Sequence, residues 1–130
     1  MTPGDEAGPG IIIRCGALVV PARLDLSETA RKVAAALPIQ SEAGRWGAEL
    51  YFEIPVVARL APDARDLMEA GEIGYWPPGK AFCIFWGKTP SSRGSEIRAA
   101  SPVNVIGRVL GDAGQLDRVR DGDLILVEQA

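Results

Sequence analysis

The chain has 130 residues, of which 47% are hydrophobic and 24% charged, and its formal net charge is −3. These values are typical of a single globular domain and exclude a disordered chain. There is no excess of positive charge to bind nucleic acid, and no apolar run approaches the roughly 20 residues that span a bilayer.

The first ten residues are rich in Gly and Pro and have no periodic apolar pattern. We therefore expect residues 1–10 to form a leader and residues 11–130 to form one domain. Asp5 and Glu6 stand where a signal peptide carries Lys or Arg, which predicts a cytoplasmic protein. Cys15 and Cys83 lie far apart in strand-like runs, which favours buried free thiols. Because the sequence contains no His, we expect no metal site, and we expect no other cofactor.

Short strands separated by Gly or Pro dominate the pattern. The alternation is clearest where Leu50 and Phe52 lie on one face and Glu49 and Tyr51 on the other, which predicts one buried and one wet face. In chain order, strands or extended runs are predicted over Ile11–Cys15, Ala17–Leu24, Glu49–Ile54, Val56–Leu60, both sides of a hairpin within Gly71–Pro90, Val103–Leu110 and Leu124–Val127. Gly16 supplies the turn of the first hairpin.

Helical spacing is clear in one segment only. Asp25 or Ser27 can cap a helix that Pro38 ends, and its apolar stripe consists of Ala30, Val33, Ala34 and Leu37. A second helical turn is expected within Asp63–Ala70, and a third around Gln115–Val119.

The central hairpin, Gly71–Pro90, reads GEIGYWPPGKAFCIFWGKTP. Pro78 and Gly79 suit the second and third positions of a type II turn, with a positive φ at the glycine. The polar segment Ser91–Ala100 is expected to be a loop or flap. Without any β-α-β alternation, these elements predict a mainly β fold, a closed antiparallel barrel of about eight strands with one or two short capping helices.

The hairpin sequence, with WGAELYFEIPV at Trp46–Val56 and SPVNVIG at Ser101–Gly107, resembles the small prokaryotic cyclophilin-like proteins. The resemblance runs from about Ile11 to Val127. It implies a closed antiparallel barrel capped by helices. It does not imply prolyl isomerase activity, because the Arg, Phe, Met and Gln motif of true cyclophilins is not found. Three guanidinium groups could replace the missing one, and the sequence does not choose among Arg14, Arg59 and Arg108.

Candidate ligand-binding residues lie in or beside these matching blocks. Aromatic side chains near strand ends suit a partly wet pocket, and polar side chains could converge with them at the barrel mouth. The alternative for each aromatic residue is core packing, and for each charged residue it is solvation. An amide at Asn104, between two valines, must either point outward or have buried partners. The candidates are Trp46, Glu49, Tyr75, Trp76, Lys80, Thr89 and Asn104.

Three functions follow from this pattern. The first is a binding module that holds a small molecule or a short peptide at the barrel mouth. The second is an enzyme, either a divergent prolyl isomerase or a catalyst of small-molecule chemistry. The third is a structural or homo-oligomeric protein. We favour the binding module, because fold resemblance alone is weak evidence for catalysis.

Overall fold

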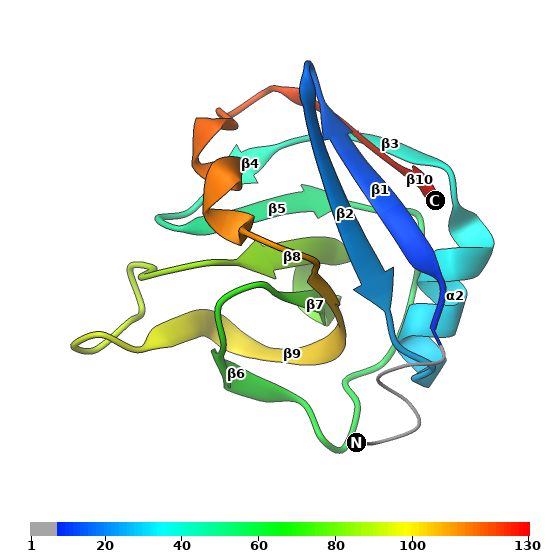
Figure 1. Cartoon of the computed structure of the whole chain (residues 1–130). Coiled ribbons are helices and arrows are strands. Elements are labelled where there is room, and N and C mark those ends of the chain that lie inside the picture. The colour runs from blue at the N-terminus through cyan, green and yellow to red at the C-terminus, as the bar shows by residue number, and fades with distance from the viewer. Residues whose placement is uncertain (1–7) are drawn as a thin grey trace.

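The computed structural model describes residues 8–130 (Figure 1). Over these residues the strands form one antiparallel sheet with the order β3-β10-β1-β2-β9-β7-β8-β5-β4, and β6 pairs with β9 off this path. The strands are β1 (Gly10–Cys15), β2 (Leu18–Leu24), β3 (Ile39–Glu42), β4 (Gly44–Arg45), β5 (Glu49–Glu53), β6 (Arg65–Met68), β7 (Glu72–Trp76), β8 (Ala81–Phe85), β9 (Ile97–Val109) and β10 (Leu124–Gln129). The fold is mainly β, as predicted.

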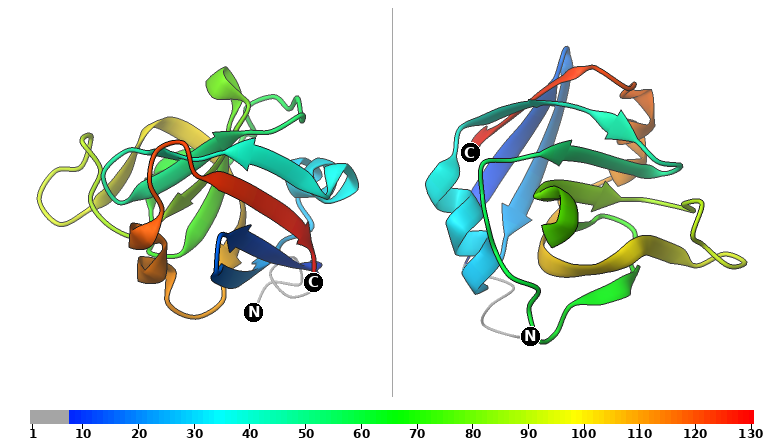
Figure 2. Two further views of the ribbon diagram at one scale, coloured as in Figure 1. Left: turned by 90° about the horizontal axis from the view of Figure 1, so that it is seen from above. Right: turned by 180° about the vertical axis from the view of Figure 1, so that it is seen from behind.

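The sheet is strongly curled (Figure 2). Its two end strands, β3 and β4, are consecutive along the chain. β3 and β4 are separated by Ala43 alone, and no hydrogen-bond ladder within residues 8–130 joins them. Ala43 instead bonds across to the segment before β10, where its N–H donates to the carbonyl oxygen of Asp123 at 2.8 Å. The hydrogen bonds establish an antiparallel sheet and stop short of the closed barrel predicted from the sequence.

The main core fills the concave side of this sheet. Phe52 and Phe82 stack with ring centroids 4.9 Å apart, and the hydroxyl of Tyr75 donates to the carbonyl oxygen of Val56 at 2.6 Å. Helix α2 (Glu28–Ala36) covers one side with the buried residues Thr29, Ala30 and Val33. No helix within residues 8–130 has the length and apolar character needed to cross a membrane.

The first hairpin and the helix confirm the sequence prediction. Gly16 has a φ of +57° in the turn between β1 and β2, and the Ser27 hydroxyl accepts a hydrogen bond from the Ala30 N–H as the helix cap. Most of the predicted leader lies outside the described residues. Its last part belongs to the fold, since Gly10 begins β1 and the Pro9 carbonyl accepts a hydrogen bond from Leu24.

Two local predictions are wrong. The hairpin turn is a 3-10 helix, η1 (Pro77–Gly79), and the positive φ of +47° falls on Lys80 instead of Gly79. Two consecutive prolines hold φ near −65°, which suits a 3-10 turn. Asp63–Ala70 contains strand β6 instead of a helical turn. The segment Val56–Leu60, predicted as an extended run, is neither helix nor paired strand. By contrast, the helical turn predicted around Gln115–Val119 is present, as a second 3-10 helix, η2 (Ala113–Arg118).

The thirteen-residue strand β9 belongs to two layers. Its second half pairs with β7 and β2 in the main sheet, whereas its first half pairs with β6 (Figure 1). The predicted loop Ser91–Ala100 therefore ends before Ile97. The first half of β9 and β6 lie over the outer face of β7 and β8, where a second apolar cluster consists of Met68, Ala81, Cys83, Phe85, Ala99 and Val103.

Gly74 allows this second layer to approach the sheet. A Cβ atom built on Gly74 would lie 2.7 Å from Cγ2 and 3.0 Å from Cβ of Val103, which is closer than carbon atoms pack. Glycine inside a strand weakens that strand, and close approach of another backbone is a common reason for its presence. The ladder between β7 and β9 also shifts register beside Gly74.

Asn104 attaches the irregular segment before β6 to the sheet. Its amide nitrogen donates to Thr29 Oγ1 at 3.0 Å and to the Arg59 carbonyl oxygen at 2.8 Å, and its amide oxygen accepts from the Ala61 N–H at 2.7 Å. The side chain is buried. From the sequence, the Asn104 amide could either point outward or have buried partners. The structure shows that it has buried partners.

Gly74→Ala is expected to lower the free energy of unfolding by about 1–3 kcal/mol, because the added methyl group overlaps Val103 in a packed layer. Urea denaturation followed by fluorescence measures the loss. The double variant Gly74→Ala/Val103→Ala should lose less than the sum of the two single variants, because the second change removes the overlapping group. Strictly additive losses would show that the contact does not limit the approach of β9.

Asn104→Asp is expected to cost about 3 kcal/mol, because it keeps the acceptor for Ala61 and removes both donors in a buried position. Thr29→Val removes one of the three partners and should cost about 1 kcal/mol. Chemical denaturation of both variants tests this order. Equal stability of Asn104→Asp and the wild type would contradict the attachment role.

Candidate functional site

A cavity of about 310 Å³ lies between the outer face of the main sheet and the first half of β9. Strands β5, β7 and β8 provide its floor, and the turn before β5 provides one wall. It is lined by Trp46, Glu49, Tyr51, Trp76, Cys83, Ala99, Ala100 and Val103. The site therefore lies outside the curled sheet, beneath the second layer, and not where the sequence argument expected the polar side chains to converge.

Glu49 reaches the cavity through the register of β5 and β8. Glu49 pairs with Phe85 and Tyr51 pairs with Cys83, so these side chains share the outer face of the sheet. The sequence predicted this face to be wet. Tyr51 is 41% exposed, but Glu49 is only 6% exposed, because the second layer covers that end of β5.

The carboxyl of Glu49 has an unusual electrostatic environment. Burial raises the pKa of Glu49 to about 7, and a hydrogen bond from the Cys83 thiol opposes that rise. Burial, together with the nearby carboxyl, raises the pKa of Cys83 well above its ordinary value, so the thiol stays neutral and acts as a donor. The Cys83 sulfur also lies 3.8 Å from the Ala81 carbonyl oxygen. At neutral pH the cavity wall thus holds a carboxyl group that can be protonated or ionised.

Two tryptophans line the cavity together with this carboxyl. The backbone N–H of Trp46 donates to the backbone carbonyl oxygen of Glu49 at 3.0 Å across a tight turn, which keeps the two residues close together. The Trp76 indole N–H donates to Ser101 Oγ at 2.7 Å, and its ring lies against Gly79, where a Cβ atom would be 2.9 Å from the ring. The Trp76 ring is therefore held by its own side-chain contacts, and Trp46 is placed by the backbone of the turn.

The other four candidates from the sequence lie elsewhere. Tyr75 belongs to the main core, and Asn104 has three structural hydrogen bonds. Lys80 is on the surface, 3.6 Å from a carboxylate oxygen of Glu53. The hydroxyl of Thr89 donates to the Arg98 carbonyl oxygen and shapes the loop before β9. The structure brings together Trp46, Glu49 and Trp76.

Sequence reasoning missed five lining residues: Tyr51, Cys83, Ala99, Ala100 and Val103. A correct prediction of the pairing between β5 and β8 would have placed Cys83 opposite Tyr51. The three β9 residues had one indirect signal, the glycine inside β7, which indicates a close neighbour without identifying it.

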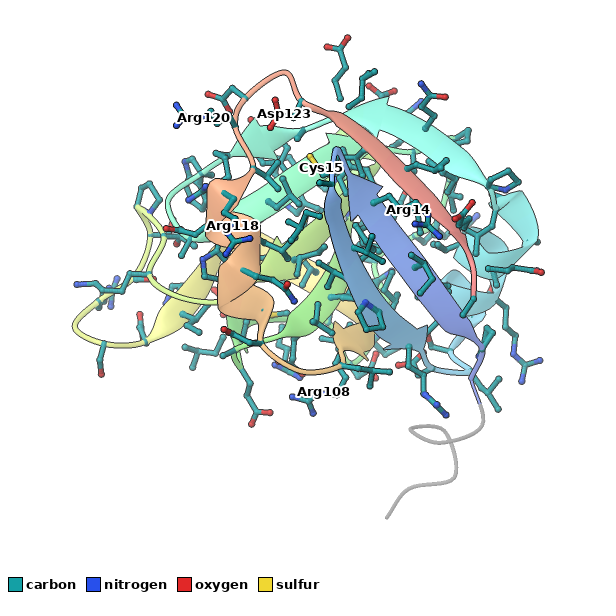
Figure 3. All side chains as sticks on the ribbon, turned by 45° about the horizontal axis from the view of Figure 1, so that its top comes forward. Arg14, Cys15, Arg108, Arg118, Arg120 and Asp123 are labelled. Atoms are coloured by element: carbon teal, nitrogen blue, oxygen red, sulfur yellow. The ribbon has the colours of Figure 1, made fainter. Side chains whose placement is uncertain are left out.

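The guanidinium candidates do not line this cavity. Arg14 pairs with Glu128 at 2.5 Å, and Arg108 lies in a different region near the end of β9 (Figure 3). Arg59 borders a separate, more polar hollow beside Asn104. Among residues 8–130, no arginine is part of the cavity wall.

A third hollow surrounds Cys15 at the tip of the first hairpin. The Cys15 thiol donates to a carboxylate oxygen of Asp123 at 3.9 Å, and Figure 3 shows the two side by side. Burial and the Asp123 charge raise the pKa of Cys15. Both cysteines are free, as predicted, but Cys15 is only half-buried. Within residues 8–130, no three His, Cys, Asp or Glu side chains form a group that could hold a metal ion.

The raised pKa of Glu49 predicts a pH-dependent stability. Between the unfolded value near 4.5 and the folded value near 7, the native state binds the proton more tightly, so stability falls as pH rises through this window. From pH 5 to pH 8, the wild type should lose roughly 2–3 kcal/mol relative to Glu49→Gln. Denaturation curves across this range measure the difference. Glu53→Gln, an exposed carboxyl on the same strand, should keep the wild-type dependence, and an identical profile in Glu49→Gln would refute the prediction.

Comparison with known proteins gives the family. Residues 10–128 match the family model described as Cyclophilin-like. The solution structure of a hypothetical protein from Archaeoglobus fulgidus is similar, with a TM-score of 0.80, 42% sequence identity, and coverage of 96% of this chain and 98% of that chain. No curated protein matches the chain. The chain therefore belongs to the cyclophilin-like family.

Proposed function

We propose that the protein binds a small molecule in the cavity beneath the second layer. The observation that carries the proposal is Glu49, a carboxyl that is 6% exposed and is directed at a space whose other walls are almost entirely apolar. Burying such a group without a basic partner costs free energy, and sites that bear this cost are often functional. A bound molecule would supply the missing polar contact.

The dimensions of the cavity support a small ligand. About 310 Å³ is at the lower end of the range of small-molecule sites, roughly 300–1,000 Å³. An apolar wall with few convergent polar groups is the usual composition of such sites. We favour a small molecule over a short peptide, because a peptide needs a longer groove than a cavity of about 310 Å³ offers.

Acid–base catalysis is the second candidate function. A carboxyl with a pKa of about 7 can both accept and donate a proton at neutral pH, which is the property of an efficient general base or acid. This observation favours proton transfer to or from a bound small molecule. It gives no support to a prolyl isomerase mechanism that uses a guanidinium, because no arginine among residues 8–130 lines the cavity. Turnover of a bound compound, lost in Glu49→Gln, would distinguish an enzyme from a binding module.

Binding can be tested by nitrogen-15 NMR with a set of small aromatic and aliphatic fragments. We expect fragments that bind to shift the indole N–H signals of Trp46 and Trp76. Ala99→Leu should weaken this binding at least about tenfold, because the longer side chain fills space beneath β9. Ala35→Leu, on the exposed face of α2, is the matched control and should bind as the wild type does.

The spectrum of Ala99→Leu also reports whether the variant is folded. If no fragment shifts the two indole signals at millimolar concentration, the proposed function is wrong. Equal binding by a folded Ala99→Leu variant and the control would place the ligand elsewhere.

A further inference from the structure

Glu49 is the only acidic or basic side chain that lines the cavity in the described part of the chain. The turn before β5 contributes Trp46, and β5 itself adds Tyr51. Strand β7 contributes Trp76 and β8 contributes Cys83. From β9 come two alanines and a valine. Among residues 8–130, no lysine or arginine lines the cavity, so an ionised Glu49 has no positive partner in the cavity wall.

Two basic side chains on or beside the strands of the cavity form ion pairs with other carboxylates. Arg98, on β9, pairs with Asp66 at 3.0 Å and with Glu96 at 2.7 Å. Lys80, beside β8, faces Glu53 on the exposed part of the sheet. Neither side chain lines the cavity. Within residues 8–130, the cavity wall therefore supplies no positive charge to balance an ionised Glu49.

The remaining walls also suit a positive group. Aromatic rings attract cations through the negative potential of their faces, and tryptophan does so most strongly. The indole N–H of Trp76 already donates to Ser101, so Trp76 offers a ligand its apolar ring and no hydrogen-bond donor. Cys83 is a neutral thiol whose hydrogen is directed to acceptors within the protein. Three aromatic side chains around one carboxylate form a site for an ammonium group attached to a hydrocarbon body.

We propose that the cavity selects small organic cations, with the ammonium group paired to the Glu49 carboxylate and the hydrocarbon part packed against Trp46, Tyr51 and Trp76. This inference rests on the proposed function, and it adds the chemical class of the ligand. An anion of the same size is disfavoured by repulsion from Glu49. A neutral molecule lacks the charge that ionised Glu49 needs.

The inference predicts how binding depends on pH. A cation binds the ionised carboxylate, so binding releases a proton from Glu49 and weakens as the pH falls below 7. Between pH 8 and pH 6 the affinity should fall roughly tenfold. A ligand that accepts a hydrogen bond from protonated Glu49 would show the opposite dependence.

Calorimetric titration with 2-phenylethylamine, 2-phenylethanol and 3-phenylpropionate tests the charge preference. The three compounds share a phenyl ring on a two-carbon chain, and the amine stays protonated across the range. At pH 8 the amine should bind at least about tenfold more tightly than the alcohol, since a hydrogen bond to a charged group is worth more than a neutral one. The propionate should bind more weakly than the alcohol.

Two variants of equal net charge test whether Glu49 causes the preference for the amine. Glu49→Gln should lower the affinity for the amine at least about tenfold and leave the affinity for the alcohol nearly unchanged. Glu53→Gln removes an exposed carboxylate from the same strand and should change neither affinity. Both variants are checked for folding by their NMR spectra.

The outcomes separate the two proposals. If the alcohol binds as tightly as the amine, or if a folded Glu49→Gln variant keeps full affinity for the amine, the cation inference is overturned and the binding function stands. If none of the three compounds binds and the wider fragment set also fails to shift the Trp46 and Trp76 signals, both proposals are wrong.

Discussion

Val103 packs directly against the backbone of Gly74, and the candidate site depends on this contact. Strand β9 can lie across the outer face of β7 only because the residue beneath it has no side chain. Its first half thereby covers Cys83 and Phe85 on the side of β8 that faces away from the main core. A sheet surface that would otherwise meet water becomes the floor of a second apolar layer, and the cavity lies where this cover reaches β5.

The two buried glutamates of this region have opposite surroundings. Glu72 accepts hydrogen bonds from both terminal nitrogens of Arg65, at 2.8 and 2.5 Å, and from the Glu69 N–H at 2.7 Å. Burial alone would raise the pKa of Glu72, but these hydrogen bonds, led by Arg65, lower it. This ion pair joins β6 to β7. Glu49 is buried to the same degree, at 6% against 7% exposed, but among residues 8–130 its side-chain partner is the thiol of Cys83. The fold therefore explains the burial of Glu72, whereas the burial of Glu49 is the observation on which the proposed ligand rests.

Local sequence signals predicted the elements whose partners are near in the chain. The Gly16 hairpin, the helix capped by Ser27 and the hairpin around Pro77 each depend on residues only a few positions apart. Predictions failed where distant pairing overrode local preference. Asp63–Ala70 has composition suited to a helical turn, but four of its residues form β6 because β9 offers hydrogen bonds from some thirty residues away. The turn type failed for a different reason, since both prolines fit a 3-10 turn as well as a type II turn.

For the site, the sequence by itself determined the chemistry of the side chains and their alternation along β5. It identified Trp46, Glu49 and Trp76 as candidates, and it showed that Glu49 and Tyr51 share one face. Only the tertiary structure decided that this face is partly covered and that Cys83 lies beside the carboxyl. The physical reason is that burial depends on what packs above a strand. Here the cover is the first half of β9, whose approach is fixed by a contact between Gly74 and Val103 that no local pattern encodes.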